Sequence, residues 1–372
     1  MAEPIRVLHI VGPIDPGGIP NFIMNLYENI NRDKVQFDIV IHKRKENDYV
    51  EAVQQMGGRV YELPRLTRSP LKNLVQLYRI VKDNQYRIVI RHTSNALVTP
   101  QLLAAKWAGA DTICHSHNET DPNRMLHRLG KLLMRAAATA RFACSEKAGR
   151  WMFGKQDFQI IHNAIPIQKF AYRPDASKRI RKEFGLGDRP VYGHIANFIA
   201  SKNHMYLLKI YKEIAKLEDS ARFFCLGEGS LRTEIEAEIK RLGIGDKVVL
   251  TGIRTDVEDF MSCFDVLIFP SVFEGLPLTL IEAQAAGLKS LISDTITRDV
   301  VMSEGILEYV SIEEQPAVWA KKAVSIQKGY DRSCQYETIA AAGYDVQVLA
   351  SWYEDYFGKI VDKGSGRNGG AV

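Results

Sequence analysis

Short apolar runs rich in β-branched residues alternate with longer amphipathic runs along nearly the whole chain of 372 residues. The short runs are typical of strands buried on both faces, and the longer runs are typical of the helices that cover them. The alternation therefore predicts an α/β protein with two doubly wound, Rossmann-like parallel sheets. The predicted strands lie at 5–12, 37–42, 59–63, 87–92, 111–114, 140–145 and 158–163 in the first half, and at 191–196, 222–227, 248–252, 266–271 and 289–293 in the second.

The stretch between these two sets, at 166–190, is the least strand-like part of the chain and ends in the turn sequence Gly185-Leu-Gly-Asp-Arg-Pro190. We place the linker there, which gives an N-terminal domain over 1–170 and a C-terminal domain over 185–344. A last helix is predicted over about 345–360, because apolar and aromatic residues recur at helical spacing between Val346 and Tyr356. Residues 363–372 are rich in Gly and Ser and are predicted to be disordered.

Composition excludes several classes of protein. With 46% hydrophobic and 25% charged residues, the chain is typical of a folded globular protein. The longest uncharged stretches, such as 93–105, are shorter than the roughly 18 apolar residues that a membrane span needs. The N-terminal apolar run is too short and too polar for a secretory signal. The five cysteines form no C-x-x-C pair, which indicates a reducing compartment and no structural zinc. We therefore expect a cytoplasmic protein.

The charge is distributed unevenly between the two halves. Residues 1–184 carry a net charge of +12 and residues 185–372 carry −7, although the whole chain carries only +5. Two domains with different electrostatic partners would explain this asymmetry. A basic half is also compatible with nucleic acid, but no interleaved aromatic and basic platform or helix-turn-helix pattern is present. We expect no nucleic-acid partner.

The residues that follow the predicted strands are candidates for a binding site, because ligands of parallel sheets bind beyond the carboxyl ends of the strands. The first strand leads to Gly17 and Gly18, which precede a helix whose N-terminus could bind a phosphate. A Gly-Gly pair can also be an ordinary turn. Lys202 precedes another helix in the second half and could meet a phosphate, although a lone lysine can equally lie on the surface.

The most specific pattern is Glu274-Gly-Leu-Pro-Leu-Thr-Leu-Ile-Glu282. Pro277 is expected to open a helix that Gly287 closes, so Glu274 precedes the helix and Glu282 lies two turns inside it. The neighbours of Glu282 are apolar, and an unpaired carboxylate there would be costly. Glu282 therefore needs hydrogen-bond donors, which either the two hydroxyls of a ribose or a nearby Arg or Lys would supply.

His115 and His117 flank a serine at the end of one strand, and strand alternation directs both to the same side. Such a pair could bind a metal, but no carboxylate or cysteine at suitable spacing completes a site. No Asp-x-Asp sequence is present, which argues against a sugar-nucleotide site that depends on a divalent cation. We expect no metal and no other cofactor.

Taken together, these motifs resemble the large family of retaining GT-B glycosyltransferases, and most of all the bacterial members that build exopolysaccharide, capsule or O-antigen. The resemblance covers about 5–294 and is most specific over 226–294. It rests on the two glutamates after Phe269-Pro-Ser271, Gly227-Glu-Gly229, Lys202-Asn-His204, His115, Ala143-Cys-Ser145, His162-Asn163 and Gly17-Gly18.

The resemblance implies two Rossmann-like domains facing one another across a cleft. A nucleotide-sugar, expected to be UDP-linked, would lie in the C-terminal domain, and the helix 345–360 would return to the N-terminal domain. By similarity, Glu282 binds the ribose and Glu274 the donor sugar. Lys202, the amides around 277–279 and Gly18 bind the diphosphate. His115 is implied near the reacting centre, with His117 as the second choice. The implied catalytic residues are His115, Glu274 and Lys202, and the implied donor-binding residues are Gly17, Gly18, Asn197, Lys202, Gly227, Arg254, Glu274, Gly275, Leu276, Pro277, Leu278, Thr279 and Glu282.

One position departs from the family pattern. Where the family usually has Gly-Arg-Phe, this chain has Ala196-Asn197-Phe198, and Asn197 cannot supply the bidentate cationic contact of an arginine. Either another base such as Arg254 compensates, or the diphosphate is held less tightly.

The resemblance implies a reaction in which the nucleoside diphosphate leaves from the face that the acceptor hydroxyl attacks. The acceptor would be a glycan or a lipid-linked sugar. Three alternatives use the same fold: a glycan phosphorylase, a nucleotide-sugar epimerase, and a catalytically silent nucleotide-sugar-binding protein, which the missing arginine makes worth considering.

The basic N-terminal half carries a further pattern. Arg124, Arg128, Lys131 and Arg135 fall in one stripe of a helix predicted over about 123–138. Lys72, Arg79 and Lys82 share one side of a second helix. These faces are either ordinary solvated surfaces or a peripheral contact with an anionic cytoplasmic membrane, which lipid-linked acceptors would require.

Overall fold

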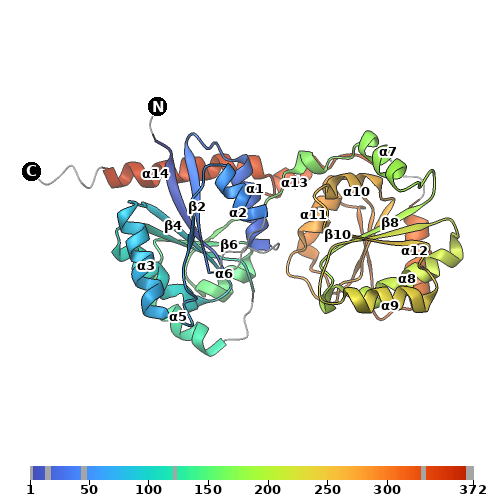
Figure 1. The fold of residues 1–372 in the computed structure, drawn as a ribbon, viewed down its shortest axis with the longest axis horizontal. Helices are drawn as coiled ribbons and strands as arrows, with labels where there is room; N and C mark the ends of the chain where they lie inside the picture. Colours follow the sequence, from blue (N-terminus) through green and yellow to red (C-terminus); the bar gives the residue numbers. More distant parts are fainter. Residues whose placement is uncertain (1–2, 13–17, 43–47, 120–123, 328–331, 366–372) are drawn as a thin grey trace, which may run out of the picture. The chain divides into compact units, whose positions relative to one another are not determined.

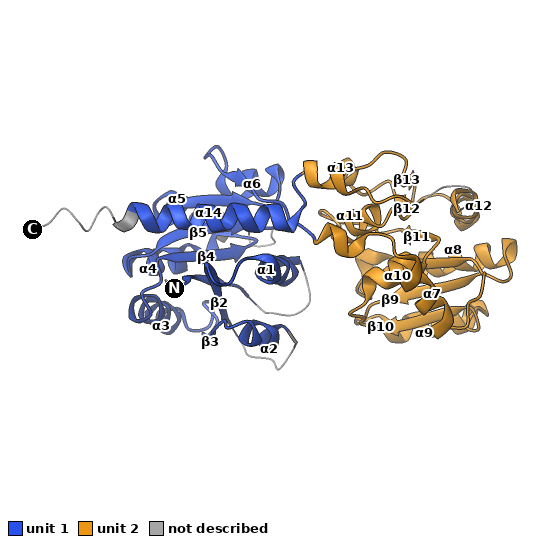
Figure 2. Ribbon diagram, turned by 90° about the horizontal axis from the view of Figure 1, so that it is seen from above, with its two compact units in different colours: residues 1–165, 343–372 blue, residues 166–342 orange. Residues whose placement is uncertain are grey.

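The structure is a computed structural model that describes residues 3–12, 18–42, 48–119, 124–327 and 332–365. The chain forms two compact units (Figure 2). Unit 1 comprises residues 1–165 and 343–372, and unit 2 comprises residues 166–342. Each unit is built on its own parallel sheet, as the alternation of apolar and amphipathic runs predicts.

Unit 1 contains a seven-stranded sheet in the order β3-β2-β1-β4-β5-β6-β7, with every pair parallel. The order reverses between β1 and β4, so the first and fourth strands are neighbours at the switch point of a doubly wound sheet. The central strands are buried on both faces, which explains their continuous apolar runs. The strands are β1 (Ile5–Ile10), β2 (Val35–Ile41), β3 (Val60–Glu62), β4 (Ile88–Thr93), β5 (Asp111–Ser116), β6 (Ala140–Ala143) and β7 (Gln159–Ile160).

Helices cover both faces of this sheet (Figure 1). One face carries α1 (Gly18–Asn29), α2 (Asp48–Gln55) and the long α14 (Val346–Ser365), whose aromatic residues Tyr353 and Phe357 are buried against the sheet. The other face carries α3 (Pro70–Asp83), the 3-10 helix η1 (Ala96–Val98), α4 (Thr99–Trp107), α5 (Arg124–Ala137) and α6 (Glu146–Phe153). Helix α14 thus packs on the sheet of the N-terminal residues although it is the last helix of the described residues.

Unit 2 contains a six-stranded parallel sheet in the order β10-β9-β8-β11-β12-β13. Helices α8, α9 and α12 cover one face, and α7, α10 and α11 cover the other (Figure 1). The strands are β8 (Val191–Ile195), β9 (Arg222–Leu226), β10 (Val248–Gly252), β11 (Val266–Phe269), β12 (Ser290–Ser293) and β13 (Leu307–Val310). The helices are η2 (Ile167–Phe170), α7 (Pro174–Glu183), η3 (Ala200–Lys202), α8 (His204–Leu217), α9 (Arg232–Leu242), α10 (Val257–Cys263), α11 (Leu278–Ala285), η4 (Arg298–Val300), α12 (Pro316–Ile326) and α13 (Tyr336–Ala341).

The twelve predicted strands are all present, and the boundaries differ in ways that matter for the site. Strand β5 continues to Ser116, two residues beyond its predicted end, so His115 lies inside the strand. Strand β13 was not predicted, because its four residues at the sheet edge are too few for a clear pattern.

The stretch 166–190 is not a free linker. Its helices η2 and α7 pack against α10, and Arg173 and Arg179 of this stretch form ion pairs with Asp259. The structure therefore divides at Ile165 and Ala342 rather than within 170–185 and at 344. The predicted disordered tail begins inside α14, since Lys363 is helical, and residues 366–372 lie outside the described part of the chain.

No helix in the described ranges is long and apolar enough to cross a membrane.

Candidate active site

In unit 2, hydrogen bonds join the loops that follow β8 and β11. Asn203 adopts a left-handed backbone conformation (φ 58°) and donates from Nδ2 to the carbonyl oxygen of Pro270 over 3.1 Å. The amide of Val272 donates to the carbonyl of Ser201 over 2.8 Å. These bonds fix the two loops beside each other at the carboxyl edge of neighbouring strands, which brings Lys202 next to Glu274.

Lys202 and Glu274 form an ion pair with 2.5 Å between Nζ and Oε1. Both side chains are largely buried, with 18% and 10% of their surface exposed. The lysine also lies over the ring of Phe269, at 5.6 Å from the ring centroid. A cation and a carboxylate that are separated by 72 positions in the chain are thus held at one point of the sheet edge.

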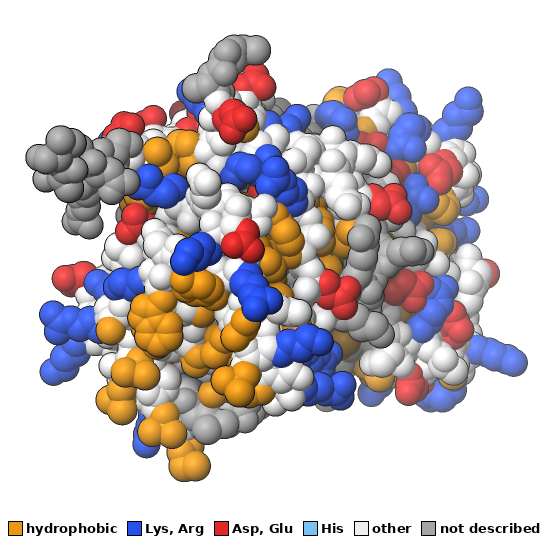
Figure 3. Space-filling view, turned by 60° about the vertical axis from the view of Figure 1, so that its left-hand side comes forward, with side chains coloured by type: hydrophobic (Ala, Val, Ile, Leu, Met, Phe, Trp, Pro, Cys, Tyr) orange, Lys and Arg blue, Asp and Glu red, His pale blue; other side chains and the backbone are white. Residues whose placement is uncertain are grey.

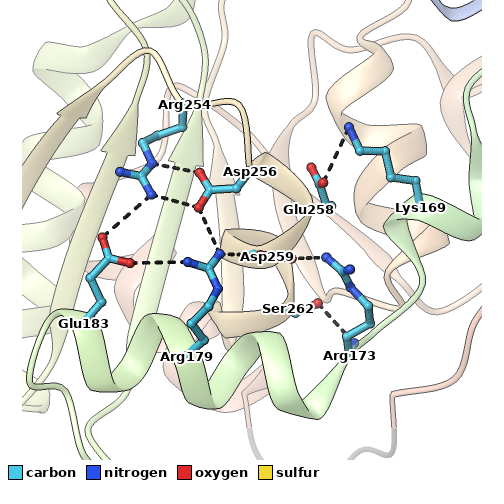
Figure 4. A network of polar contacts seen from close by, with 9 residues as sticks. All are labelled: Lys169, Arg173, Arg179, Glu183, Arg254, Asp256, Glu258, Asp259 and Ser262. Atoms are coloured by element: carbon cyan, nitrogen blue, oxygen red, sulfur yellow. Dashed lines mark hydrogen bonds and ion pairs between the residues drawn. The ribbon is translucent and has the colours of Figure 1, made fainter. Parts of the chain in front are cut away.

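Glu282 lies in the second turn of α11, and burial raises the pKa of its carboxyl group to about 7. Within the described ranges, the carboxylate of Glu282 forms no hydrogen bond or ion pair, and its backbone carbonyl accepts from the amide of Ala286 over 3.0 Å. Lys169, whose positive charge lowers the pKa of Glu282, pairs instead with Glu258 at 3.5 Å (Figure 4). The sequence left open whether a ribose or a basic residue partners Glu282, and the structure leaves its carboxylate available for a ligand.

Helix α11 begins beside this carboxylate. Pro277 precedes its first residue, Leu278, and the amides of Leu278 and Thr279 belong to the first turn, where backbone N–H groups have no partner inside the helix. Gly275 is exposed, and no atom would lie within 4 Å of an added Cβ. Leu276 is partly exposed in the same loop. The loop and the helix N-terminus therefore offer backbone donors to an anion.

Gly227 follows β9 and has a structural role in this edge. Its φ is +140°, and a Cβ there would lie 2.0 Å from the carbonyl oxygen of Ala196. Only glycine permits this close approach, which shapes the loop that carries Asn197. The side chain of Asn197 is exposed and forms no hydrogen bond with the described residues.

Arg254 does not take the place of the missing arginine. Its guanidinium makes two hydrogen bonds of 2.8 Å to Asp256 and lies 3.7 Å from Glu183 (Figure 4). It also follows β10, the outermost strand of the sheet, whereas Lys202 and Glu274 follow β8 and β11. The structure joins Arg254 to α7 and not to the Lys202–Glu274 pair.

In unit 1, a pocket of about 630 Å³ opens at the carboxyl edge of the sheet. Gly18, at the start of α1, lines it, while Gly17 lies outside the described residues. Two arginines, Arg65 and Arg91, also line it, and no carboxylate does so among the residues described. Arg91 is buried and donates to Gln101 over 2.8 Å, and its burial lowers its pKa to about 10. This pocket favours an anionic ligand.

Three histidines form a chain that ends at this pocket. His9 Nδ1 and His92 Nε2 are 3.0 Å apart, and His92 Nδ1 and His117 Nε2 are 2.9 Å apart. Desolvation lowers the pKa of His9 and of His117 to about 3, and that of His92 well below its usual value. All three rings are therefore neutral near pH 7, and each carries a single N–H.

The neutral chain has two possible orientations. If the protons point from His117 toward His9, the last N–H lies on His9 Nε2, which is buried without a hydrogen-bond partner. If they point the other way, His117 carries its proton on Nδ1. Asn163 lines the same pocket and its side chain opposes the lowering of the His117 pKa. Among the described residues, His9 Nε2 and His117 Nδ1 are both buried without a hydrogen-bond partner, but His117 lines the pocket and His9 does not. A ligand in the pocket can accept a proton from His117 only, so a bound ligand would favour the second orientation, in which His117 presents an N–H.

His115, the histidine that the resemblance put first, lies behind this chain. Its ring has no exposed surface and packs edge-on against Phe22 and Phe142, and it does not line the pocket. His117 does line the pocket, because it follows the last residue of β5. The signal that could have separated the two is the length of the strand, which sequence patterns define poorly.

The same histidines form a possible metal cluster. Ligand nitrogens of His92, His115 and His117 all lie within 4.8 Å of one another. The sequence showed two of these residues, and the third joins them because β4 pairs with β5 and sets His92 opposite His115. A metal ion at this cluster would have to replace the hydrogen bond between His92 and His117. Hydrogen bonding between the histidines therefore explains the cluster better than metal binding does.

The predicted basic stripe is only partly available. Arg128 and Arg135 of α5 are exposed, and the side chain of Arg124 lies outside the described part of the chain. Lys131 donates to the carbonyl oxygen of Trp151 over 2.6 Å, and burial lowers its pKa.

Unit 2 carries a cation, two carboxylates and a helix N-terminus at the edge of its sheet, and unit 1 carries a polar pocket at the edge of its own sheet. Two parallel sheets of this topology with these features are typical of the class of GT-B glycosyltransferases. The model of the family "Glycosyl transferases group 1" matches residues 189–328, and that of "Glycosyltransferase Family 4" matches residues 16–169. The chain belongs to this glycosyltransferase family and is an enzyme of the hexosyltransferase class.

Individual relatives agree with this assignment. "Putative glycosyltransferase EpsF" of Bacillus subtilis (strain 168) is 33% identical over 361 residues, which cover 92% of this chain and 93% of the relative. A UDP-Gal:alpha-D-GlcNAc-diphosphoundecaprenol alpha-1,3-galactosyltransferase of Escherichia coli is 25% identical over 70% of this chain and 72% of its own.

Solved structures show the same fold. Anabaena Alr3699/HepE in complex with UDP and glucose superposes with a TM-score of 0.71 at 16% identity, covering 99% of this chain and 100% of its own. WaaG, a glycosyltransferase involved in lipopolysaccharide biosynthesis, superposes with a TM-score of 0.64 at 13% identity, covering 93% of this chain and 95% of its own.

Proposed function

We propose that this enzyme transfers a sugar, with retention of configuration, from a UDP-sugar to a lipid-linked sugar diphosphate in bacterial surface-polysaccharide synthesis. The observation that carries the proposal is the buried Lys202–Glu274 ion pair, together with the unpartnered carboxylate of Glu282 in α11, the helix that follows Glu274. The named complexes of the similar Anabaena protein with UDP-glucose and with UDP support the choice of donor.

The three charged residues divide the donor between them. Glu282 accepts hydrogen bonds from the ribose hydroxyls, which restore the solvation that its carboxylate lacks. When the donor binds, Lys202 leaves Glu274 and pairs with the diphosphate. The diphosphate also accepts hydrogen bonds from the amides of Leu278 and Thr279. Glu274 is then free to accept hydrogen bonds from hydroxyls of the donor sugar. In the absence of donor, the ion pair keeps both charges compensated.

Catalysis in this proposal is mainly electrostatic. The nucleoside diphosphate leaves as negative charge develops on its terminal oxygen, and Lys202 and the helix N-terminus stabilise that charge. The same oxygen takes the proton of the acceptor hydroxyl as the new glycosidic bond forms on that face. Glu274 acts as a sugar ligand and not as a nucleophile. The N–H of His117 donates to a substrate hydroxyl and orients it.

The acceptor follows from the charge of the unit 1 pocket. Arg65 and Arg91 line it without any carboxylate among the residues described, which suits an acceptor that carries phosphate better than a neutral glycan. Relatives from Escherichia coli and Campylobacter jejuni are named for diphospho-undecaprenol acceptors, which supports a lipid-linked diphosphate. Such an acceptor would place the reaction at the inner face of the cytoplasmic membrane.

The donor assignment is tested with calorimetry on a panel of UDP-glucose, UDP-galactose, UDP-N-acetylglucosamine and GDP-mannose. Glu282→Ala should weaken binding of free UDP at least tenfold, whereas Glu274→Ala should lower turnover and leave UDP affinity nearly unchanged, because it also releases Lys202. Equal losses of UDP affinity in the two variants would refute the division of roles.

Product analysis with a synthetic lipid-diphosphate sugar then separates the alternatives. A new glycosidic bond of retained configuration supports the proposal. Binding without turnover identifies a silent binding protein, and turnover that needs only inorganic phosphate or inverts a hydroxyl of the donor identifies a phosphorylase or an epimerase.

We expect turnover to continue in EDTA, because Lys202 and backbone amides neutralise the diphosphate without a cation. Lys202→Ala should cost more turnover than chelation does. If EDTA abolishes turnover and magnesium or manganese restores it, the proposed metal-free mechanism is wrong.

A further inference from the structure

Helix α5 presents apolar side chains to solvent. Met125 and Leu132 are 76% and 78% exposed, and Leu129 and Leu133 are also more than half exposed. The opposite side of the helix carries His127, Gly130 and Met134 and faces the protein, where His127 and Met134 are buried. An amphipathic helix on a globular domain normally buries its leucines, so this orientation is unusual.

Contacts of the small and polar residues fix that orientation. A Cβ added to Gly130 would lie 2.1 Å from the carbonyl oxygen of Ala96, so only glycine permits this packing. The amide of Ala96 donates to His127 Nδ1 over 3.1 Å, and the ring of His127 stacks on Trp151 with 4.1 Å between the centroids. The helix therefore cannot turn to bury its leucines without losing these contacts.

Neighbouring helices extend the exposed apolar surface. Lys106 of α4 donates to the carbonyl of Ala136 in α5 over 2.6 Å, which places the C-terminal ends of these helices side by side. Trp107 follows Lys106 and is 73% exposed. We define the α3–α5 face by its exposed apolar residues, which are Leu71, Val75, Trp107, Met125, Leu129, Leu132 and Leu133. Figure 3 shows hydrophobic side chains gathered between lysines and arginines on one side of the molecule.

The charges on these helices are almost all positive. In sequence, α3, α4 and α5 carry eight Lys and Arg and a single acidic residue, Asp83. Lys72, Arg79, Arg128 and Arg135 are exposed. A second copy of this chain would bring like charges together across the same face. An anionic bilayer complements both the leucines and the basic rim.

The face is continuous with the unit 1 pocket. Helix α5 packs on η1, and Leu97 and Val98 of η1 line the pocket. Leu66 and Thr67, which precede α3, line it as well. The N-termini of both helices therefore lie at the sheet edge where the pocket opens.

We propose that the α3–α5 face inserts its apolar side chains into an anionic phospholipid bilayer and so presents the unit 1 pocket to a lipid-linked acceptor. The choice of acceptor rests on the proposed function, but the insertion itself does not. Insertion goes beyond the electrostatic contact that the basic residues alone predict. Leucines inserted into the bilayer would hold the protein there even when salt screens the charges.

The test is co-sedimentation of the full chain with vesicles of phosphatidylcholine and phosphatidylglycerol. Leu129→Ser together with Leu132→Ser should lower the vesicle partition coefficient at least tenfold, since two exposed apolar anchors are lost. The matched control is Val348→Ser, which alters a side chain that is 63% exposed on α14, on the opposite face of the same sheet, and should leave partition unchanged. A double variant that binds within about twofold of the wild type would overturn the proposal.

Salt separates insertion from simple electrostatic attachment. The wild type should retain measurable binding at about 0.5 M NaCl, where the Debye length is only a few ångströms. Complete loss of binding at that salt concentration would leave an electrostatic contact and overturn insertion.

Trp107 reports insertion directly. Brominated phospholipids should quench part of the tryptophan fluorescence of the wild type, and Trp107→Phe should remove that part. Absence of quenching in vesicle-bound protein would contradict insertion of this face. A dimer in lipid-free solution that the double variant dissociates would assign the face to a second copy instead.

Nucleotide-sugar binding in lipid-free solution distinguishes this proposal from the proposed function. The double variant should bind nucleotide-sugar as the wild type does, because none of its substitutions touches the donor site. Wild-type vesicle binding without any nucleotide-sugar binding would remove the proposed function and leave the membrane face intact.

Discussion

The two sheets of this molecule have the same doubly wound topology but opposite chemistry at their carboxyl edges. Unit 1 places neutral imidazoles and two arginines around its pocket, with no carboxylate among the described lining residues. Unit 2 places a lysine paired with one carboxylate, Glu274, and a second carboxylate, Glu282, that has no partner among the described residues. Because the two sheets share one backbone arrangement, the difference lies in the side chains that follow the strands. On the proposed function, these side chains suit the unit 1 edge to an anionic acceptor and the unit 2 edge to a donor with hydroxyls and phosphates.

The strongest test of this contrast is removal of the only cation of the unit 2 pair. Lys202→Met keeps most of the apolar stem but removes the charge, and we expect kcat to fall about 100- to 1,000-fold, as when one preorganised donor to a developing anion is lost. Steady-state kinetics with the donor identified by calorimetry measure the effect.

Lys216→Met is the matched control, because Lys216 lies in α8 and pairs with Glu213 on the exposed surface. Turnover of Lys202→Met at the level of this control would show that the ion pair is merely structural.

The unit 1 edge is tested by comparing two histidines two positions apart. His117→Ala should lower kcat about 10- to 100-fold and lower the melting temperature less than His115→Ala does, because His117 lines the pocket, where water can replace its hydrogen bond to His92. His115→Ala should instead destabilise the fold by about 2–4 kcal/mol, because it leaves a cavity between Phe22 and Phe142.

Thermal unfolding and kinetics of both variants decide between these roles. A melting temperature unchanged in His115→Ala, together with a larger loss of turnover than in His117→Ala, would return the catalytic role to His115.

Glu282 makes the donor edge sensitive to pH. Since its carboxyl group has a pKa of about 7 in the folded protein, it is mostly protonated at pH 6 and mostly ionised at pH 8. Nucleotide-sugar affinity, which needs the ionised form, should rise about tenfold between these values. Calorimetry at both pH values measures this rise, and Glu282→Gln should abolish it.

The stability of the ligand-free protein should change in the opposite direction. A carboxyl pKa that is raised by folding means that the native state holds the proton more tightly than the unfolded chain, so the free energy of unfolding falls as pH rises from about 4.5 to 7. Glu282→Gln should flatten this part of the profile. An unchanged profile would mean that the carboxylate has a partner at neutral pH.

The smallest expected effect concerns the missing arginine. Asn197 is exposed and Arg254 is engaged by Asp256, so no described cation replaces the arginine beside the diphosphate. Asn197→Arg should therefore raise kcat/KM by about two- to fivefold, as one added charge-assisted hydrogen bond at an exposed position would do. A lower rate with weaker nucleotide binding would show that Asn197 has another role.

Much of the fold could be predicted because periodicity is a local property. The twelve predicted strands and the final helix follow from apolar runs whose meaning does not depend on distant residues. The glutamate pattern was equally local, since Pro277 sets the start of α11 and thereby the place of Glu282 within it. The stretch 166–190 was misassigned because its prolines suggest a linker, whereas its arginines pair with α10 far along the chain.

The sequence by itself determined the α/β class, the candidate glutamates and the excess of positive charge in the first half. Only the tertiary structure decided which charge pairs with which, because partners such as Lys202 and Glu274 meet through strands that are neighbours in the sheet and distant in the chain. It also decided that His92 joins His117, that Asp256 engages Arg254, and that the leucines of α5 face outward. The physical reason is that spacing along the chain fixes which residues share a face, whereas packing against other elements fixes what that face meets.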